Sequence, residues 1–172
     1  MDKIHNRCLT TCQSCCKFSK DEVYYAPIVM DEEIAKIKSD GLYKKVFHPF
    51  KKSKNVFQIS LIKSKVSKDL FVCPYLDENT QMCIIYNIRP FDCKFWPFIL
   101  MHDKERKKVF IAHFNKKICQ ITDVMSNAKF KEYLIKYIDN LVQQKNISEL
   151  INKYPDMIWD YEPDTFMIKE LS

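Results

Sequence analysis

Residues 83–97 read CIIYNIRPFDCKFWP, and residues 8–16 read CLTTCQSCC. Together with Cys73 and Cys119, these two stretches contain every cysteine of the chain. Cysteines two or three residues apart allow one turn of backbone to place several sulfur atoms around a metal. The neighbouring Cys15 and Cys16 are hard to explain as a disulfide, because their side chains point in different directions. We therefore expect the cysteine-bearing loops to be organised by a metal centre.

The size of the chain predicts one domain. It has 172 residues, 47% of them hydrophobic, which is enough to bury a core without help from a metal. We therefore expect a single cysteine-cluster metal-binding domain over residues 1–172. The N-terminal residues are charged, and no apolar run approaches the roughly 18 residues of a membrane span. These features predict a cytoplasmic protein with no membrane partner, and cytosolic thiols stay reduced, which favours metal ligands over disulfides.

All eight cysteines are candidate metal ligands. Four thiolates complete either a zinc ion or a four-iron cluster, so eight supply two such sets. Adjacent cysteines more readily contact two metals, or separate corners of one multinuclear cluster, than a single ion. This favours an iron-sulfur cluster, 4Fe-4S in particular, over zinc, while the alternative is that some cysteines are small core residues. The candidates are Cys8, Cys12, Cys15, Cys16, Cys73, Cys83, Cys93 and Cys119.

Glycine content and charge exclude or weaken other functions. Gly41 is the only glycine, whereas phosphate-binding loops and dinucleotide fingerprints need several. The net charge of +6 falls to +2 if two thiolate centres contribute −2 each, so nucleic acid is an improbable partner. The lysines, dense from Lys44 to Lys68, indicate a solvated surface or an acidic partner.

Arg89 and Tyr86 are candidate cofactor-binding residues, because one helical face would present both toward Cys83 or Cys93. A guanidinium donates hydrogen bonds to sulfur and offsets thiolate charge, although an ion pair with Asp92 or Asp77 is the alternative. Aromatic residues near Cys93 would shield a centre from water or serve as core: Phe91, Phe95, Trp96 and Phe98.

The four histidines carry weaker signals. His5 lies three residues before Cys8 and is able to replace a cysteine ligand, although a surface position is the simpler interpretation. His48, His102 and His113 have no partner that the sequence identifies. No catalytic residue is assigned.

The periodicity of the chain predicts an α+β fold with a small antiparallel sheet, a short N-terminal helix, cysteine-rich metal-binding loops and C-terminal helices. A helix is expected over residues 30–37, with Asp31 as N-cap and Gly41 as its stop. Two strands that pair with each other are expected over residues 56–66 and 70–73, followed by a turn over residues 77–80.

The second half is expected to begin with a hairpin of residues 99–102 and 109–114. A helix over residues 122–144 and another over residues 147–153 should follow, since apolar residues recur there at helical spacing. The tail from residue 154 is expected to be irregular, with Trp159, Tyr161 and Phe166 covering the core.

The cysteine pattern resembles the YkgJ-like cysteine-cluster family of zinc- or iron-chelating proteins. That family has a cluster ending in a cysteine pair, a Cys-x-x-Leu element, a Cys-x-Ile-Tyr-x-x-Arg-Pro-x-x-Cys stretch and a later cysteine. Two departures are the three-residue gap between Cys8 and Cys12 and Lys94 in place of arginine. Besides the eight cysteines, the matching residues are Leu76, Ile85, Tyr86, Arg89, Pro90 and Pro97.

The resemblance implies a metal-binding protein that handles electrons, metal or clusters, with a protein redox partner as one possibility. The first cluster also resembles that of flagellin lysine methylases, which gives an iron-sulfur-dependent protein-lysine methyltransferase-like enzyme as the alternative. The Cys8, Cys12 and Cys15 spacing matches the radical S-adenosylmethionine motif too. Ser14, the single glycine and the short chain oppose that last interpretation.

Overall fold

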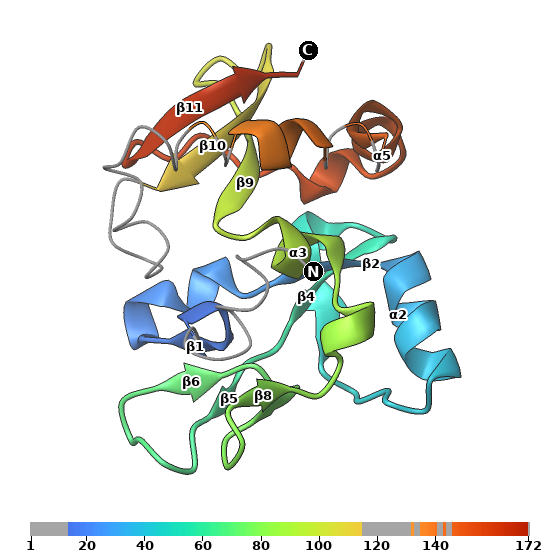
Figure 1. The fold of residues 1–172 in the computed structure, drawn as a ribbon, viewed down its shortest axis with the longest axis vertical. Helices are drawn as coiled ribbons and strands as arrows, with labels where there is room; N and C mark the ends of the chain where they lie inside the picture. The colour runs from blue at the N-terminus through green and yellow to red at the C-terminus, as the bar shows by residue number, and fades with distance from the viewer. Residues whose placement is uncertain (1–13, 115–131, 133–134, 141–142, 144–145, 172) are drawn as a thin grey trace. The chain divides into compact units, whose positions relative to one another are not determined.

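The protein is represented by a computed structural model, which describes residues 14–114, 132, 135–140, 143 and 146–171. The chain divides into two compact units, residues 1–96 and residues 97–172, and each is described by itself (Figure 1). The organisation of residues 1–172 as one domain stays a prediction. Within the described residues, no helix combines the length and apolar character needed to cross a membrane.

The core of the first unit lies between a sheet and a helix. β2 (Ile28–Met30), β4 (Val56–Ile59) and β3 (Phe47–Pro49) form an antiparallel sheet in the order β2-β4-β3. α2 (Asp31–Ser39) follows β2 and buries Ile34 and Ile37. A 3-10 turn, η3 (Phe50–Lys52), joins β3 to β4.

Short strands place the first cysteines. η1 (Ser14–Cys16) leads into β1 (Lys17–Phe18), which belongs to a sheet of order β1-β6-β5 with β6 (Phe71–Val72) and β5 (Ile62–Lys63). The backbone N–H of Cys73, directly after β6, donates to the carbonyl of Cys16 at 2.9 Å. Strand pairing thus joins two cysteine-bearing segments that are far apart in sequence.

The motif over residues 83–97 is built from small elements. β7 (Leu76–Asp77) and β8 (Met82–Cys83) form a hairpin, followed by η4 (Tyr86–Ile88) and α3 (Phe91–Phe95). η2 (Lys20–Tyr25) lies after β1. Pro90 is the N-cap of α3, and its fixed φ suits the start of a helix.

The second unit is a separate antiparallel sheet. β9 (Phe98–His102) and β10 (Val109–Phe114) pair from His102 opposite Val109 to Phe98 opposite His113, and β11 (Thr165–Glu170) adds to the other side of β10. α5 (Ile147–Lys153) and η6 (Pro155–Met157) precede β11. The described residues of the longer predicted helix, 132, 135–140 and 143, are helical.

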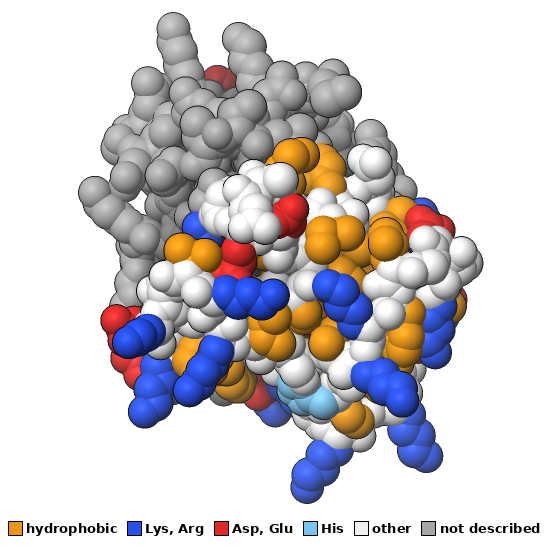
Figure 2. Space-filling view, turned by 90° about the horizontal axis from the view of Figure 1, so that it is seen from below, with side chains coloured by type: hydrophobic (Ala, Val, Ile, Leu, Met, Phe, Trp, Pro, Cys, Tyr) orange, Lys and Arg blue, Asp and Glu red, His pale blue; other side chains and the backbone are white. Residues whose placement is uncertain are grey.

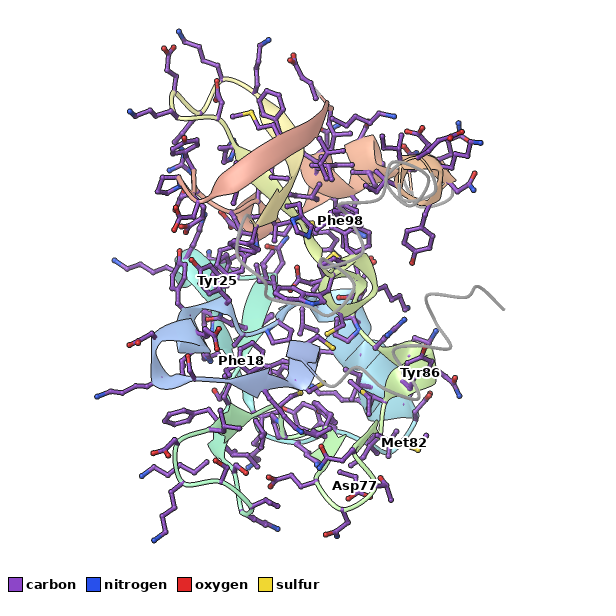
Figure 3. All side chains as sticks on the ribbon, turned by 60° about the vertical axis from the view of Figure 1, so that its left-hand side comes forward. Phe18, Tyr25, Asp77, Met82, Tyr86 and Phe98 are labelled. Carbon is purple, nitrogen blue, oxygen red and sulfur yellow. The ribbon has the colours of Figure 1, made fainter. Side chains whose placement is uncertain are left out.

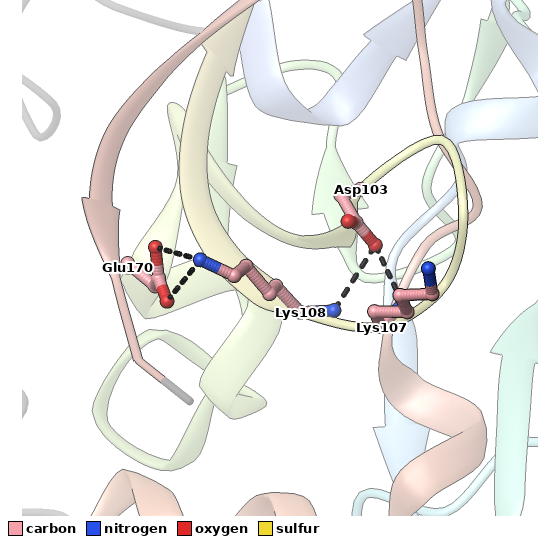
Figure 4. Close-up of polar contacts among 4 residues, drawn as sticks. All are labelled: Asp103, Lys107, Lys108 and Glu170. Atoms are coloured by element: carbon pink, nitrogen blue, oxygen red, sulfur yellow. Dashed lines mark hydrogen bonds and ion pairs between the residues drawn. The ribbon is translucent and has the colours of Figure 1, made fainter.

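The β9–β10 turn is fixed by one carboxylate. Oδ1 of Asp103 accepts the backbone N–H of Lys107 at 2.6 Å and that of Lys108 at 3.0 Å (Figure 4). The ammonium group of Lys108 in turn pairs with Glu170 of β11 at 2.9 Å. The hairpin expected from the sequence is therefore confirmed, with its polar loop ordered by hydrogen bonds.

The α+β class is confirmed, and several details of the predicted elements are wrong. Met30 is the N-cap of α2, so Asp31 is the first helical residue. The single strand over residues 56–66 is broken into β4 and β5, although β5 does pair with β6 as expected. There are several small sheets where one was expected.

The tail from residue 154 was expected to be irregular, and this is wrong. It contains η6 and β11, because β10 offers an edge whose backbone groups bond to the tail. Trp159 is buried as expected, with 3% exposed, whereas Tyr161 is 37% exposed and does not cover the core.

Candidate metal centre

Four separate segments of the first unit bring five cysteines near one another. Cys15 and Cys16 lie in η1, Cys73 follows β6, Cys83 ends β8 and Cys93 lies in α3. All five are free thiols. Figure 3 shows sulfur atoms in the part of the unit between the labelled Phe18 and Tyr86. The predicted ligands Cys8, Cys12 and Cys119 lie outside the described residues.

Cys16 and Cys73 form a hydrogen-bonded pair. The hydrogen bond from Cys16, followed by backbone hydrogen bonds from Tyr75 and the charge of Lys44, lowers the pKa of Cys73. Hydrogen bonds with Cys15 and Cys73, together with burial, hold the pKa of Cys16 well above its usual value. Of this pair, Cys73 is therefore the more acidic thiol and Cys16 the less acidic one.

Cys15 contacts its neighbour and also lines a small pocket. Its Sγ lies 4.0 Å from Sγ of Cys16, and the pocket wall includes Cys15 but not Cys16. The pocket offers only ≈ 10 Å³ to the centre of a water molecule, close to the minimum for one water. Its walls are Cys15, Phe18, Tyr25, Pro27, Asp92, Cys93 and Trp96.

Cys83 and Cys93 are thiols whose charged forms are disfavoured. Burial, followed by the charges of Cys73 and Cys15, raises the pKa of Cys83 to about 11. Burial and then Asp92 hold the pKa of Cys93 well above its usual value, with smaller contributions from the other cysteines. Because electrostatic influence of this kind falls off with distance, these cysteines form one cluster. A bound metal cation would reverse the effect by stabilising thiolates.

Two cations lie beside the cysteine cluster. Cζ of Arg89 lies 4.3 Å from the ring centroid of Tyr86, and its charge opposes the rise in the pKa of Cys83. Arg89 is only 9% exposed. Arg89 therefore packs on Tyr86, and the role of both residues toward a cofactor stays a prediction.

Lys44 is the second cation, and sequence reasoning missed it among the surface lysines. Its ammonium group donates to the carbonyl of Pro74 and lies 5.1 Å from the ring centroid of Tyr75. Tyr75 is fully buried, and burial raises the pKa of its hydroxyl. Lys44 reaches Pro74 across 30 residues of sequence, so no local signal identified it.

Two carboxylates hold α3 in place, a role that sequence reasoning assigned to neither of them. Glu33 accepts the backbone N–H of Met30 at 3.1 Å and that of Phe91 at 2.6 Å. Asp92 accepts the backbone N–H of Ile28 at 3.0 Å. Burial raises the pKa of Asp92 to about 7 despite that hydrogen bond. Together they connect the helix of Cys93 to β2 and α2.

The predicted aromatic residues are divided between the units. Phe91 and Phe95 are buried and stack at 5.1 Å, and Trp96 lines the pocket of Cys93. Phe98 belongs to β9, in the second unit, where its ring meets that of His113 at 5.8 Å. The first three are therefore in place to exclude water near Cys93.

The described histidines lie on strands that carry no cysteine. Nδ1 of His48 lies 2.9 Å from the hydroxyl of Ser60. His102 is on β9, and His113 is buried in β10, where burial lowers its pKa. His5 lies outside the described residues.

The donor chemistry fits a thiophilic metal. Clustered thiols in an apolar setting, with cations beside them, suit zinc or an iron-sulfur cluster and not a hard cation such as calcium. Among the described residues, no three cysteine, histidine, aspartate or glutamate side chains are arranged to hold one metal ion. The five cysteines are thus part of a predicted set whose other members lie outside the description, and the full ligand assignment stays a prediction.

Comparison with known proteins gives a family. The family described as "CxxCxxCC: Putative zinc- or iron-chelating domain" matches residues 7–133, a range that contains all eight cysteines. No curated protein and no solved structure matched the chain. The family description supports metal binding, with zinc or iron as the metal. On the strength of this match, the chain belongs to the CxxCxxCC family.

Proposed function

We propose that this protein binds an iron-sulfur cluster through its clustered cysteines and uses it in electron transfer or cluster handling, with zinc as the alternative metal. The observation that carries the proposal is the approach of free thiols from four segments: η1, the residue after β6, the end of β8, and α3. Five thiols exceed the four that one tetrahedral ion accepts. An arrangement of this kind is typical of a metal centre and costly without one.

The contacts of the adjacent cysteines support a multinuclear centre. The thiol of Cys16 is hydrogen-bonded to those of Cys15 and Cys73, and Cys15 in addition lines the pocket with Cys93. The pair thus connects cysteines of different segments, which suits a centre with more than one metal atom. The buried aromatic rings of Phe91 and Phe95 near Cys93 would also slow the loss of a cluster.

Arg89, Tyr86 and Lys44 would act around the centre. A thiolate cluster carries negative charge, which the guanidinium and the ammonium group offset from the sides of Cys83 and Cys73. We expect these cations to tune the stability and the potential of a bound cluster. Free thiols in such number would suit a reducing compartment such as the cytoplasm.

The methyltransferase alternative gains no support from the pocket beside Cys15 and Cys93. Space for the centre of about one water excludes a molecule of the size of S-adenosylmethionine from that pocket. A titration of the metal-loaded protein with S-adenosylmethionine tests this alternative directly, and saturable binding would revive it.

The decisive experiment is anaerobic purification followed by quantification of iron, acid-labile sulfide and zinc. A brown protein that contains iron and sulfide supports the cluster, and a colourless protein with stoichiometric zinc supports the alternative. Cys83→Ser should lower the metal content, whereas Met82→Ser is a matched control on the same strand and should not. Absence of all metals from the wild-type protein would overturn the proposal.

A further inference from the structure

One segment of the first unit is strongly basic. Residues 42–68 contain eight lysines and no aspartate or glutamate. All eight lysines are exposed in the structure. Such a segment repels itself unless something acidic binds it or solvent and salt screen it. The lysines are Lys44, Lys45, Lys51, Lys52, Lys54, Lys63, Lys65 and Lys68.

Three of these lysines lie beside the hairpin that carries Cys83. Lys63 is on β5, and Lys65 and Lys68 follow it before β6. Within the part of the chain that the structure describes, none of the three forms an ion pair. The charge of Lys65 helps to lower the pKa of Glu78, and all three ammonium groups are exposed to solvent.

The loop of these lysines is tied to the β7–β8 hairpin by Glu78. One carboxylate oxygen of Glu78 accepts the hydroxyl of Ser64 at 2.5 Å, and the other accepts the backbone N–H of Lys65 at 3.0 Å. These bonds hold the pKa of Glu78 below its usual value. The β5–β6 hairpin and the β7–β8 hairpin thus form one preformed surface.

Exposed aliphatic side chains accompany the lysines. Met82 is 50% exposed and Ile84 is 47% exposed, and they flank the half-buried Cys83. On the adjoining hairpin, Ile62 is 42% exposed and Val66 is 75% exposed. Figure 2, seen from the side of β5, β6 and β8, shows lysine side chains surrounding hydrophobic ones. We name the set Ile62, Lys63, Lys65, Val66, Lys68, Met82 and Ile84 the basic face.

We propose that the basic face docks a protein partner that carries acidic and aliphatic side chains, and that this partner covers Cys83. Lysines would steer and orient an acidic surface, while burial of the exposed aliphatic groups would stabilise the complex. The link between this partner and a metal centre rests on the proposed function, whereas the docking itself does not.

The side chains favour protein over nucleic acid. Platforms for single-stranded nucleic acid stack bases on aromatic rings, and the hydrophobic members of the basic face are aliphatic. The nearby exposed ring of Tyr43 is already engaged, because it stacks on Phe47 at 5.9 Å and Nζ of Lys38 lies 4.7 Å from its centroid. Preferential binding to RNA or to anionic membranes is a competing outcome of the test.

The test uses the full-length protein and four labelled or immobilised probes. They are a peptide of mixed glutamate and leucine, a polyglutamate peptide of equal charge, single-stranded polyuridine RNA, and phosphatidylserine vesicles. Binding is measured at low and at physiological salt. We expect the mixed peptide to bind most tightly, and to protect Cys83 from alkylation as measured by mass spectrometry of each cysteine. Absent binding of the mixed peptide, or tighter binding of any other probe, overturns the proposal.

Variants locate the binding surface. Lys63→Glu with Lys68→Glu, and separately Met82→Ser with Ile84→Ser, should each weaken mixed-peptide binding about tenfold or more. Lys52→Glu with Lys54→Glu is the control. It makes the same change of charge, but before β4, whereas Lys63 and Lys68 follow β4, so it should weaken mixed-peptide binding less than about threefold. An equal loss in the control would show non-specific attraction and overturn the proposal.

The metal content of each protein is measured in the same samples. Peptide binding with protection of Cys83 in a protein that never takes up metal would overturn the proposed function and leave the docking surface in place. Metal uptake without peptide binding would overturn the docking surface and leave the proposed function in place.

Discussion

In the described part of residues 97–172 several charged side chains form ion pairs with one another, whereas in the described part of residues 1–96 two carboxylates accept backbone N–H groups around the cysteine-bearing helix α3. The second unit joins Arg106 to Asp160 at 3.1 Å and Lys108 to Glu170 at 2.9 Å. In the first unit, the carboxylate oxygens of Glu33 and Asp92 accept hydrogen bonds from backbone N–H groups and so fix α3. The carboxylates of the first unit thus position a helix of the candidate site, whereas the ion pairs of the second unit lie on an exposed surface.

The largest effect should come from removing a thiol of the first unit. Cys73→Ser removes the thiol that is hydrogen-bonded to Cys16, and we expect the metal affinity to fall by more than the roughly 10–100-fold typical of the outer residues around a metal. Met82→Ser serves as the control. Metal analysis after anaerobic purification measures the change, and unchanged metal content in Cys73→Ser would remove that residue from the centre.

A smaller loss should follow from Glu33→Gln. Each oxygen of the carboxylate accepts one backbone N–H group. In glutamine the NH₂ group replaces one of these oxygens and cannot accept a hydrogen bond. The free energy of unfolding should therefore fall by about 1–3 kcal/mol. Denaturant unfolding of the metal-free protein measures the change. If the loss matches that of Glu170→Gln in the second unit, the two units do not use their carboxylates differently.

The next effect concerns the acid stability of the second unit. Burial lowers the pKa of His113, so its folded form binds protons less readily than its unfolded form. Stability is therefore present above the unfolded pKa of about 6.5 and is lost as the pH falls below it. Asp92, with its pKa raised to about 7, contributes with the opposite sign in the first unit.

The contribution of His113 is isolated by comparison with His113→Gln. Between pH 7.5 and 5, the wild-type protein should lose more stability than the variant, because the variant has no group to protonate at that position. Thermal unfolding across this range measures the difference. A constant difference at every pH would show that His113 keeps an ordinary pKa.

The smallest effect should come from Glu170→Gln. Lys108 and Glu170 are about half exposed, and exposed ion pairs contribute roughly 0–1 kcal/mol. We expect little change in denaturant unfolding and a weak dependence on salt. A loss above about 2 kcal/mol would mean that this pair is as important as the buried carboxylates.

Elements marked by local sequence signals were predictable, and elements that depend on distant partners were not. The acidic first turn of α2 and the polar loop between β9 and β10 are visible within short windows of sequence. β11 was missed, because its strand form depends on β10, about 55 residues earlier.

In the candidate site, too, the residues marked by local spacing were predicted and those with distant partners were not. Cysteine spacing identified Cys15, Cys16, Cys73, Cys83 and Cys93 as residues that converge, and the structure places them together. Glu33 looked like an ordinary first-turn residue, and its bond to Phe91 spans 58 residues. Lys44 was one lysine among many until the chain brought it beside Pro74.

X-ray absorption at the iron and zinc edges of the anaerobically purified full-length protein tests the central claim most directly. Our account predicts that the bound metal has sulfur neighbours at about 2.3 Å, with iron-iron scattering in addition if the centre is a cluster. A first shell of oxygen and nitrogen alone, or no metal edge at all, would contradict the account.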